Sequence, residues 1–364
     1  MSNLVEPKEY LTDPSVYPGL SLLDIIEARG ISQAELAQRM NKPYQAVNEI
    51  VNGKKEIIPE TAIALEHVLG LPAGFWLKLE SNYRESLARE KEIRELDGQI
   101  KLSKAYPYRE MANNGWIKNT NDPTERVSEL LRWFGVTHLN SVDNQYKVAF
   151  RKSRESNISK EKLAAWLRLG EVESQRLQYG DFTNSKDRAE ELTQELRKLT
   201  LEDIRKADEE ARSLCARYGI ALIFTPEFKS FPVNGATRWV SGRYIVQVSL
   251  RYKWHDIFWF SIFHELGHVF LHGKEFFLER QGKNRDEKSE EDEADHFAAR
   301  NLIPEGRYDD IQKIVHISGN QVKEFASEIG IHPGIVVGRL QHDGMPRNRL
   351  NYLKAKLKWV GDEK

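Results

Sequence analysis

The segment His264-Glu265-Leu266-Gly267-His268 constrains this chain more than any other, because its histidines can act together only if the segment is helical. On an α-helix, His264 and His268 lie one turn apart on the same face, with roughly 6 Å between their Cα atoms. This spacing lets two imidazole nitrogens reach one zinc ion at about 2.0–2.1 Å. Glu265 is placed to take a proton from a water molecule at the metal. The alternative is a buried amphipathic helix that carries two hydrogen-bonded histidines.

A catalytic zinc site normally takes a third protein ligand. Cys215 is the only cysteine of the chain, which excludes a thiolate site and leaves histidines and carboxylates. His272 is a poor candidate, because on a straight helix it lies two turns, about 12 Å, beyond His264. We expect His272 to pack or to support the ligands instead.

Acidic residues of a second helix are better candidates for the third ligand. The segment Ser289–Ala299 opens with a serine cap and an acidic first turn, and it continues with core-type residues. The register of this helix cannot be set from its residues alone, so three glutamates stay open: Glu290, Glu291 and Glu293. The alternative for the first half of the acidic run is a solvated loop and helix start.

Three segments ahead of the histidine pair have the pattern of strands. Ile220–Phe224 is apolar, Gly235–Val240 follows a loop, and Arg243–Leu250 alternates and is rich in β-branched residues. They predict a small antiparallel sheet, with whose exposed edge a peptide backbone could pair near the metal. The expected fold class is therefore mainly α with a small antiparallel β-sheet (α+β). By proximity in sequence, four polar side chains could stabilise charge on a substrate oxygen: Arg238, Tyr244, Arg251 and His255.

The N-terminal part has the signals of short, well-capped helices. Ser32-Gln33-Ala34-Glu35 is a capping box that starts one helix, and Pro43 opens the next, from Tyr44 to Val51, which ends at Asn52-Gly53. Two short helices joined by a tight turn fit a DNA-binding helix-turn-helix, which usually works as a dimer. The alternative is a helical hairpin used only for dimerisation.

The second helix of this pair carries the residues expected to meet DNA. Gln and Asn can pair bidentately with adenine, and lysines at the helix ends can contact phosphates and make binding salt-sensitive. The candidates for base edges are Tyr44, Gln45 and Asn48, and those for phosphates are Lys42, Lys54 and Lys55. A dimer would bind two half-sites of a double-stranded operator about one helical turn apart.

Two family resemblances rest on these motifs. Ser32–Ala37 resembles the core of Cro/C1-repressor (XRE) regulators, and with Leu71–Leu77 the segment resembles more closely the HigA-type antitoxin regulators. The histidine motif followed by Glu293–Pro304 (EADHFAARNLIP) resembles the ImmA/IrrE zinc metallopeptidases, whose usual pattern is E-A-N-x-F-A-x-x-L-L-x-P. In that family the third zinc ligand is a glutamate of this second helix, which maps onto Glu293. Asp295 replaces the usual asparagine and would alter a group behind the ligands.

The resemblances imply a division of the chain into three parts. Residues 1–80 would form an all-α helix-turn-helix domain, residues 81–158 a charged helical connecting region, and residues 159–364 a zincin-like metallopeptidase domain. No apolar run approaches the ~18 residues of a membrane span, and the N-terminus lacks a signal-peptide pattern. We expect a cytoplasmic protein without a membrane partner. The net charge of -1 does not exclude a local DNA-binding patch.

The resemblances also imply two functions. The first is a dimeric DNA-binding transcriptional regulator with a zinc-dependent endopeptidase domain, in which Glu265 is the catalytic base and a regulatory protein is cut. The alternative is a HigA-type antitoxin and autorepressor, whose peptidase-like domain binds or senses a partner, such as a small toxin ribonuclease, without cleavage. A complete H-E-x-x-H favours chemistry, because a purely structural domain does not need Glu265.

Overall fold

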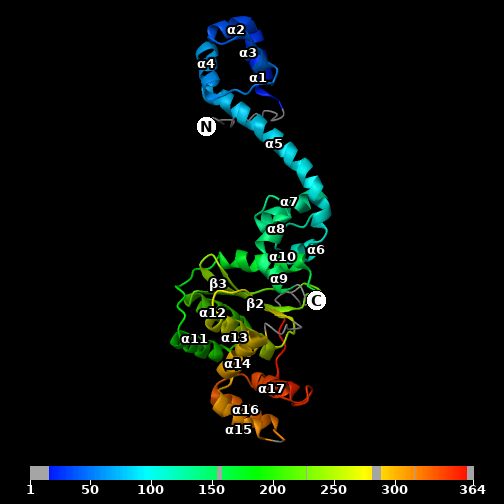
Figure 1. Cartoon of the computed structure of the whole chain (residues 1–364), viewed down its shortest axis with the longest axis vertical. Coiled ribbons are helices and arrows are strands. Elements are labelled where there is room, and N and C mark those ends of the chain that lie inside the picture. Colours follow the sequence, from blue (N-terminus) through cyan, green and yellow to red (C-terminus); the bar gives the residue numbers. More distant parts are fainter. Residues whose placement is uncertain (1–15, 154–157, 227, 281–287, 315, 359–364) are drawn as a thin grey trace, which may run out of the picture. The chain divides into compact units, whose positions relative to one another are not determined.

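The computed structural model describes residues 16–153, 158–226, 228–280, 288–314 and 316–358. The chain divides into two compact units, Met1–Gly98 and Gln99–Lys364 (Figure 1). Among the described residues, no helix is both long enough and apolar enough to cross a membrane.

The N-terminal unit is built of helices. They are α1 (Pro18–Ala28), α2 (Gln33–Arg39), α3 (Tyr44–Val51), α4 (Pro59–Leu69) and α5 (Ala73–Ser103), the last of which continues into the second unit. Of the predicted capping box of α2, the serine cap is confirmed, since the Ser32 hydroxyl accepts a hydrogen bond from the Glu35 N–H at 3.2 Å, while the Glu35 carboxylate accepts from Arg39. The predicted bounds of α3 are confirmed as well.

A shared core holds the helices of this unit together. A Cβ atom on Gly19 would lie 2.1 Å from the Ile50 carbonyl oxygen, so glycine is needed where α1 crosses the end of α3. The fully buried apolar side chains of the unit include Leu22, Ile26, Leu36, Val47, Leu65 and Trp76. Because these side chains face inward, the polar face of α3 is left toward solvent.

The C-terminal unit surrounds a small sheet with helices. Its helices are α6 (Tyr108–Asn113), α7 (Pro123–Phe134), α8 (Ser141–Gln145), α9 (Lys147–Lys152), α10 (Lys160–Ser174), α11 (Lys186–Leu199), α12 (Ile204–Arg217), α13 (His255–Leu271), α14 (Lys288–Leu302), α15 (Glu305–Gln312), α16 (Gly319–Ile329) and α17 (Pro333–His342), followed by a 3₁₀ turn (Asn351–Leu353). Its strands are β1 (Ile220–Phe224), β2 (Val233–Val240), β3 (Arg243–Val248) and β4 (Phe277–Arg280).

The α+β class is confirmed, but the sheet is mixed and not purely antiparallel. The strand order is β1-β3-β2-β4, in which β1 runs parallel to β3 while β2 is antiparallel to β3 and β4. A tight hairpin with positive φ at Ser241 and Gly242 joins β2 to β3, and β1 pairs with the other edge of β3. The short edge strand β4, which follows α13, was not predicted.

Helices cover both faces of the sheet (Figure 1). Tyr244 and Val246 of β3 belong to the same core as Trp259 and Ile262 of α13. On the opposite face, the Gln247 side chain donates to the Trp166 carbonyl of α10 at 2.6 Å. Residues of β2 that point to the first face therefore meet α13, which carries the histidine pair.

Candidate metal centre

Close packing of α14 on α13 builds the centre. A Cβ atom on Gly267 would lie 3.0 Å from Cα of Ala294, so the two backbones nearly touch at this point. Ala294 and Ala298 of α14 are fully buried, and with them the whole middle of α13. The acidic first turn of α14 is thereby brought over the histidine pair.

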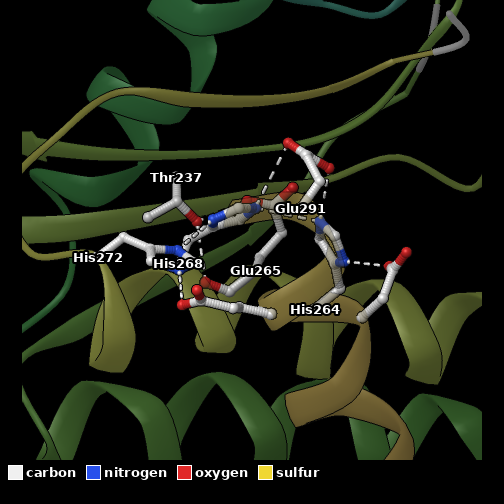
Figure 2. Close-up of polar contacts among 8 residues, drawn as sticks. Thr237, His264, Glu265, His268, His272 and Glu291 are labelled. Carbon is white, nitrogen blue, oxygen red and sulfur yellow. Dashed lines mark hydrogen bonds and ion pairs between the residues drawn. The ribbon is translucent and has the colours of Figure 1, made fainter. Parts of the chain in front are cut away.

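Three side chains converge on one point between these helices. His264 Nε2 and His268 Nε2 lie 3.1 Å apart, and the carboxylate oxygens of Glu291 lie 3.4 Å from the former and 3.7 Å from the latter. Tetrahedral zinc with bonds of about 2.0–2.1 Å separates its ligand atoms by about 3.3 Å. The donor set of two imidazoles and one carboxylate, in this spacing, fits zinc (Figure 2).

The structure brings Glu291 to the histidines, and not Glu293, which the family pattern indicated as the ligand. Glu291 precedes the buried Ala294 by three residues and Ala298 by seven, so it lies on the face of α14 that contacts α13. Glu293 lies about 100° away from Ala294 around the helix. Its side chain is 59% exposed and contacts His272.

Each histidine of the pair also has a partner on its other ring nitrogen. Asp295 Oδ1 lies 2.8 Å from His264 Nδ1, and His272 Nδ1 lies 2.9 Å from His268 Nδ1. Such partners orient a histidine and fix which of its nitrogens carries the proton. The supporting role expected for His272 and the importance of Asp295 behind the ligands agree with these contacts.

Strand β2 positions the carboxylate of Glu265. The Thr237 hydroxyl lies 2.6 Å from Glu265 Oε2, and both residues are fully buried (Figure 2). Gly235, two residues earlier on the same face, has no room for a side chain, because a Cβ atom there would lie 2.2 Å from Glu265 Oε1. No sequence signal had singled out Thr237 or Gly235, since their role depends on pairing between a strand and a distant helix.

The edge strand β4 contributes one aromatic side chain to the centre. The Phe277 ring stacks on the His268 ring, with centroids 4.1 Å apart and planes inclined by 11°. This ring covers one face of the His268 imidazole and limits its rotation.

Two of the polar residues suggested as stabilisers of substrate charge lie elsewhere. Arg238 points to the α10 face of the sheet, where it binds Glu171 at 2.8 Å and the Leu167 carbonyl at 2.7 Å. His255 accepts from the Trp259 indole N–H at 3.0 Å, and burial, with His332 nearby, lowers its pKa to about 3. Both contacts are structural.

The DNA-binding candidates lie on or beside α3 and are accessible to different extents. Tyr44 is 54% exposed, and Lys54 and Lys55 are exposed in the turn that follows the helix. The Gln45 amide donates to Glu49 at 2.9 Å, and the Asn48 amide donates to Gln33 of α2 at 3.2 Å. Lys42 is half-buried in the turn before the helix. Gln33, which sequence reasoning did not propose, therefore lies beside the candidate base-reading residues.

Comparisons with known proteins match two separate parts of the chain. Residues 22–76 match the family model described as helix-turn-helix, and residues 215–341 match the one described as the IrrE N-terminal-like domain. Virulence-associated protein A of Dichelobacter nodosus is 38% identical to this chain over 69 residues, which are 18% of this chain and 68% of that protein.

Similar solved structures cover a part of the chain. An addiction module antidote protein of the HigA family from Coxiella burnetii is 27% identical and covers 23% of this chain and 94% of its own, with a TM-score of 0.22. The Pseudomonas aeruginosa antitoxin HigA, solved with the higBA promoter, is also 27% identical, with the same coverage and a TM-score of 0.22. The family models place the chain among the XRE-type helix-turn-helix proteins through residues 22–76 and among the IrrE-like peptidase-domain proteins through residues 215–341.

Proposed function

We propose that this chain is a DNA-binding transcriptional regulator whose C-terminal unit is a zinc-dependent endopeptidase that cuts a regulatory protein. One observation carries the proposal: the candidate ligand atoms of His264, His268 and Glu291 lie within 3.1–3.7 Å of one another, and the carboxylate of Glu265, the residue after His264, is fixed by the Thr237 hydroxyl. A zinc site with a purely structural role would not need Glu265.

His264, His268 and Glu291 would hold the zinc ion. When bound, zinc supplies Lewis-acid chemistry, which lowers the pKa of a water molecule toward ~7 and polarises a peptide carbonyl. The two outer partners, Asp295 and His272, keep the ring nitrogens that face the ion free of protons.

Glu265 is the base in this proposal. The carboxylate would remove a proton from the attacking water as the new C–O bond forms, and it would then pass that proton to the departing amine nitrogen as the C–N bond breaks. The Thr237 hydroxyl donates to Oε2 of Glu265 and fixes the orientation of the carboxylate. Fixing the carboxylate in advance reduces the reorganisation that the reaction would otherwise require.

The protein substrate would be recognised in an extended form. β4 is the outer strand of the described sheet and lies next to His268, so a peptide could add to its edge by main-chain hydrogen bonds. A hollow of about 920 Å³ is lined by Asp295, Phe260 and residues of α17, and in part by apolar side chains such as Ile257 and Leu302. An apolar side chain of the substrate fits this hollow.

The DNA partner would be a double-stranded operator bound through α3. Tyr44, Gln45 and Asn48 would meet base edges in the major groove, and Lys42, Lys54 and Lys55 would contact phosphates. The exposure of Tyr44, Lys54 and Lys55 supports this assignment. We infer a homodimer, because a two-fold operator requires two copies of the reading helix.

A substrate trap tests the proposal. Glu265→Gln should retain a bound protein that the wild-type chain releases after cutting, and the captured protein should then be cleaved when it is mixed with purified wild-type protein and zinc. If the captured protein is a small ribonuclease that stays intact, the chain is an antitoxin-type regulator that binds without cleavage, and the endopeptidase proposal fails.

A further inference from the structure

We infer that His272 and Glu293 form a relay that orients His268 for metal binding, so that both are positioning residues and neither is a ligand. The inference rests on the proposed zinc centre. Its observations are separate from those that define the ligands, because they concern the outer ring nitrogen of His268 and the exposed face of α14.

The relay follows from the two ring nitrogens of His268. Nε2 faces His264 Nε2 at 3.1 Å, on the side where the ligands converge, so it must be free of a proton when it binds a metal. The neutral imidazole then carries its proton on Nδ1, which lies 2.9 Å from Nδ1 of His272. We therefore assign His268 as the donor and His272 as the acceptor in this contact.

The same assignment of protons applies to the two ring nitrogens of His272. His272 accepts at Nδ1, so its own proton lies on Nε2, which is 3.2 Å from Glu293 Oε2. A carboxylate that accepts this proton makes the ring of His272 a better acceptor, and His268 in turn a better ligand. The negative charge of Glu293 thus acts on the metal through two imidazole rings.

Helix geometry places His272 between His268 and Glu293. Asp295 reaches His264 directly at 2.8 Å, because it lies four residues after Glu291 on the face of α14 that contacts α13. His268 lies one turn further along α13, and its Nδ1 atom meets Nδ1 of His272. His272, again one turn on, spans the gap to Glu293.

His272 and Glu293 differ in burial, so their loss should affect metal affinity to different extents. The His272 side chain is 7% exposed and its ring lies 5.3 Å from that of Phe277, which also stacks on His268. The Glu293 side chain is 59% exposed, so water screens its charge. Loss of His272 should therefore cost more metal affinity than loss of Glu293.

Competition between the full-length protein and a zinc chelator measures this difference. His272→Phe keeps a ring of similar shape and removes both nitrogens, and we expect zinc affinity to fall by about 10- to 100-fold. His272→Asn restores an acceptor near the position of Nδ1 and should recover most of that loss. Glu293→Ala should lower affinity by less than tenfold, and it should add nothing in a His272→Phe background.

A matched control and a spectroscopic signature complete the test. His296→Phe removes a histidine of α14 that pairs with Glu305 at 3.2 Å and whose side chain is 75% exposed, and it should leave affinity unchanged. In the cobalt-substituted protein, the visible absorption bands should shift in His272→Phe and return toward wild type in His272→Asn. Calorimetry of each variant checks that the C-terminal unit is folded.

Three other outcomes would contradict the relay, the role given to Glu293, or the metal centre itself, and they can be told apart. Wild-type affinity and spectrum in His272→Phe would refute the relay. A large loss in Glu293→Ala that persists in the His272→Phe background would show that Glu293 is itself a ligand. A wild-type chain that binds no zinc would refute the metal centre, and the relay with it.

Discussion

Thr237 and Glu265 are joined by a buried hydrogen bond of 2.6 Å between the threonine hydroxyl and Oε2 of the carboxylate. The bond links the second strand of the sheet to the helix that carries the histidine pair, across 28 residues of sequence. A base that is fixed in this way does not have to be ordered when a substrate arrives.

Removal of the Thr237 hydroxyl should slow cleavage without loss of zinc. Thr237→Val keeps the shape of the side chain but removes a hydrogen bond to a charged group, which contributes about 1.5–3 kcal/mol. We expect about a 10- to 100-fold lower rate on the trapped substrate, with unchanged zinc content. Thr237→Ser, which keeps the hydroxyl, is the control and should cleave at close to the wild-type rate; equal rates for Val and wild type would contradict the assignment.

A side chain at Gly267 should separate α14 from the histidine pair. In Gly267→Leu the new side chain would meet the α14 backbone at Ala294, because even a Cβ atom at position 267 would lie 3.0 Å from Cα of Ala294. Overpacking of this kind costs about 1–3 kcal/mol of stability, and the displaced Glu291 should no longer bind zinc tightly. Chelator competition and calorimetry measure the two effects. Gly306→Leu in α15, where a Cβ atom would meet nothing within 4 Å, is the control and should change neither.

Lysines after α3 should set the salt dependence of DNA binding. Lys54→Ala combined with Lys55→Ala should weaken binding to the DNA upstream of the chain's own gene. The slope of log K against log salt should become shallower by about 0.9 for each lost phosphate contact. Gel shifts at several salt concentrations give the slope. Lys91→Ala, an exposed lysine of α5 with a side chain 75% exposed, should leave it unchanged.

His255 should make the C-terminal unit less stable in mild acid. Its pKa is about 3 in the folded chain because of burial, against 6.5 for the free side chain, so the unfolded chain binds one more proton between these values. The stability from the neutral ring is fully present above pH 6.5 and is lost as the pH falls toward 3, with a slope of at most about 1.4 kcal/mol per pH unit. The unfolding temperature of His255→Gln, followed by calorimetry, should fall less steeply than that of wild type over this range.

Local signals explain which parts of the fold could be predicted from sequence. Capping at Ser32 and the proline and glycine at the ends of α3 act within a few residues, so the bounds of these helices followed from the sequence. β4 is four residues long, and its pairing with β2 depends on a partner about forty residues away, so no local pattern marked it.

The sequence could not decide which glutamate of α14 meets the histidine pair. Every residue from Glu290 to Asp295 is acidic except Ala294, so the acidic run itself does not distinguish one face of the helix from another. The choice is made by tertiary packing, where Gly267 admits Ala294 and thereby turns Glu291 toward the histidines. The family pattern pointed to this helix and to Glu293, whereas the structure brings Glu291 of the same helix to the histidines.

The most direct measurement compares wild type with Glu265→Gln for zinc content and for cleavage of the trapped protein. The substitution keeps the side-chain size and leaves His264, His268 and Glu291 untouched, so we expect one zinc ion per chain in both proteins. Cleavage should be abolished in the variant, because an amide cannot take the proton from water. Cleavage by Glu265→Gln at the wild-type rate, or a wild-type chain without zinc, would contradict the account.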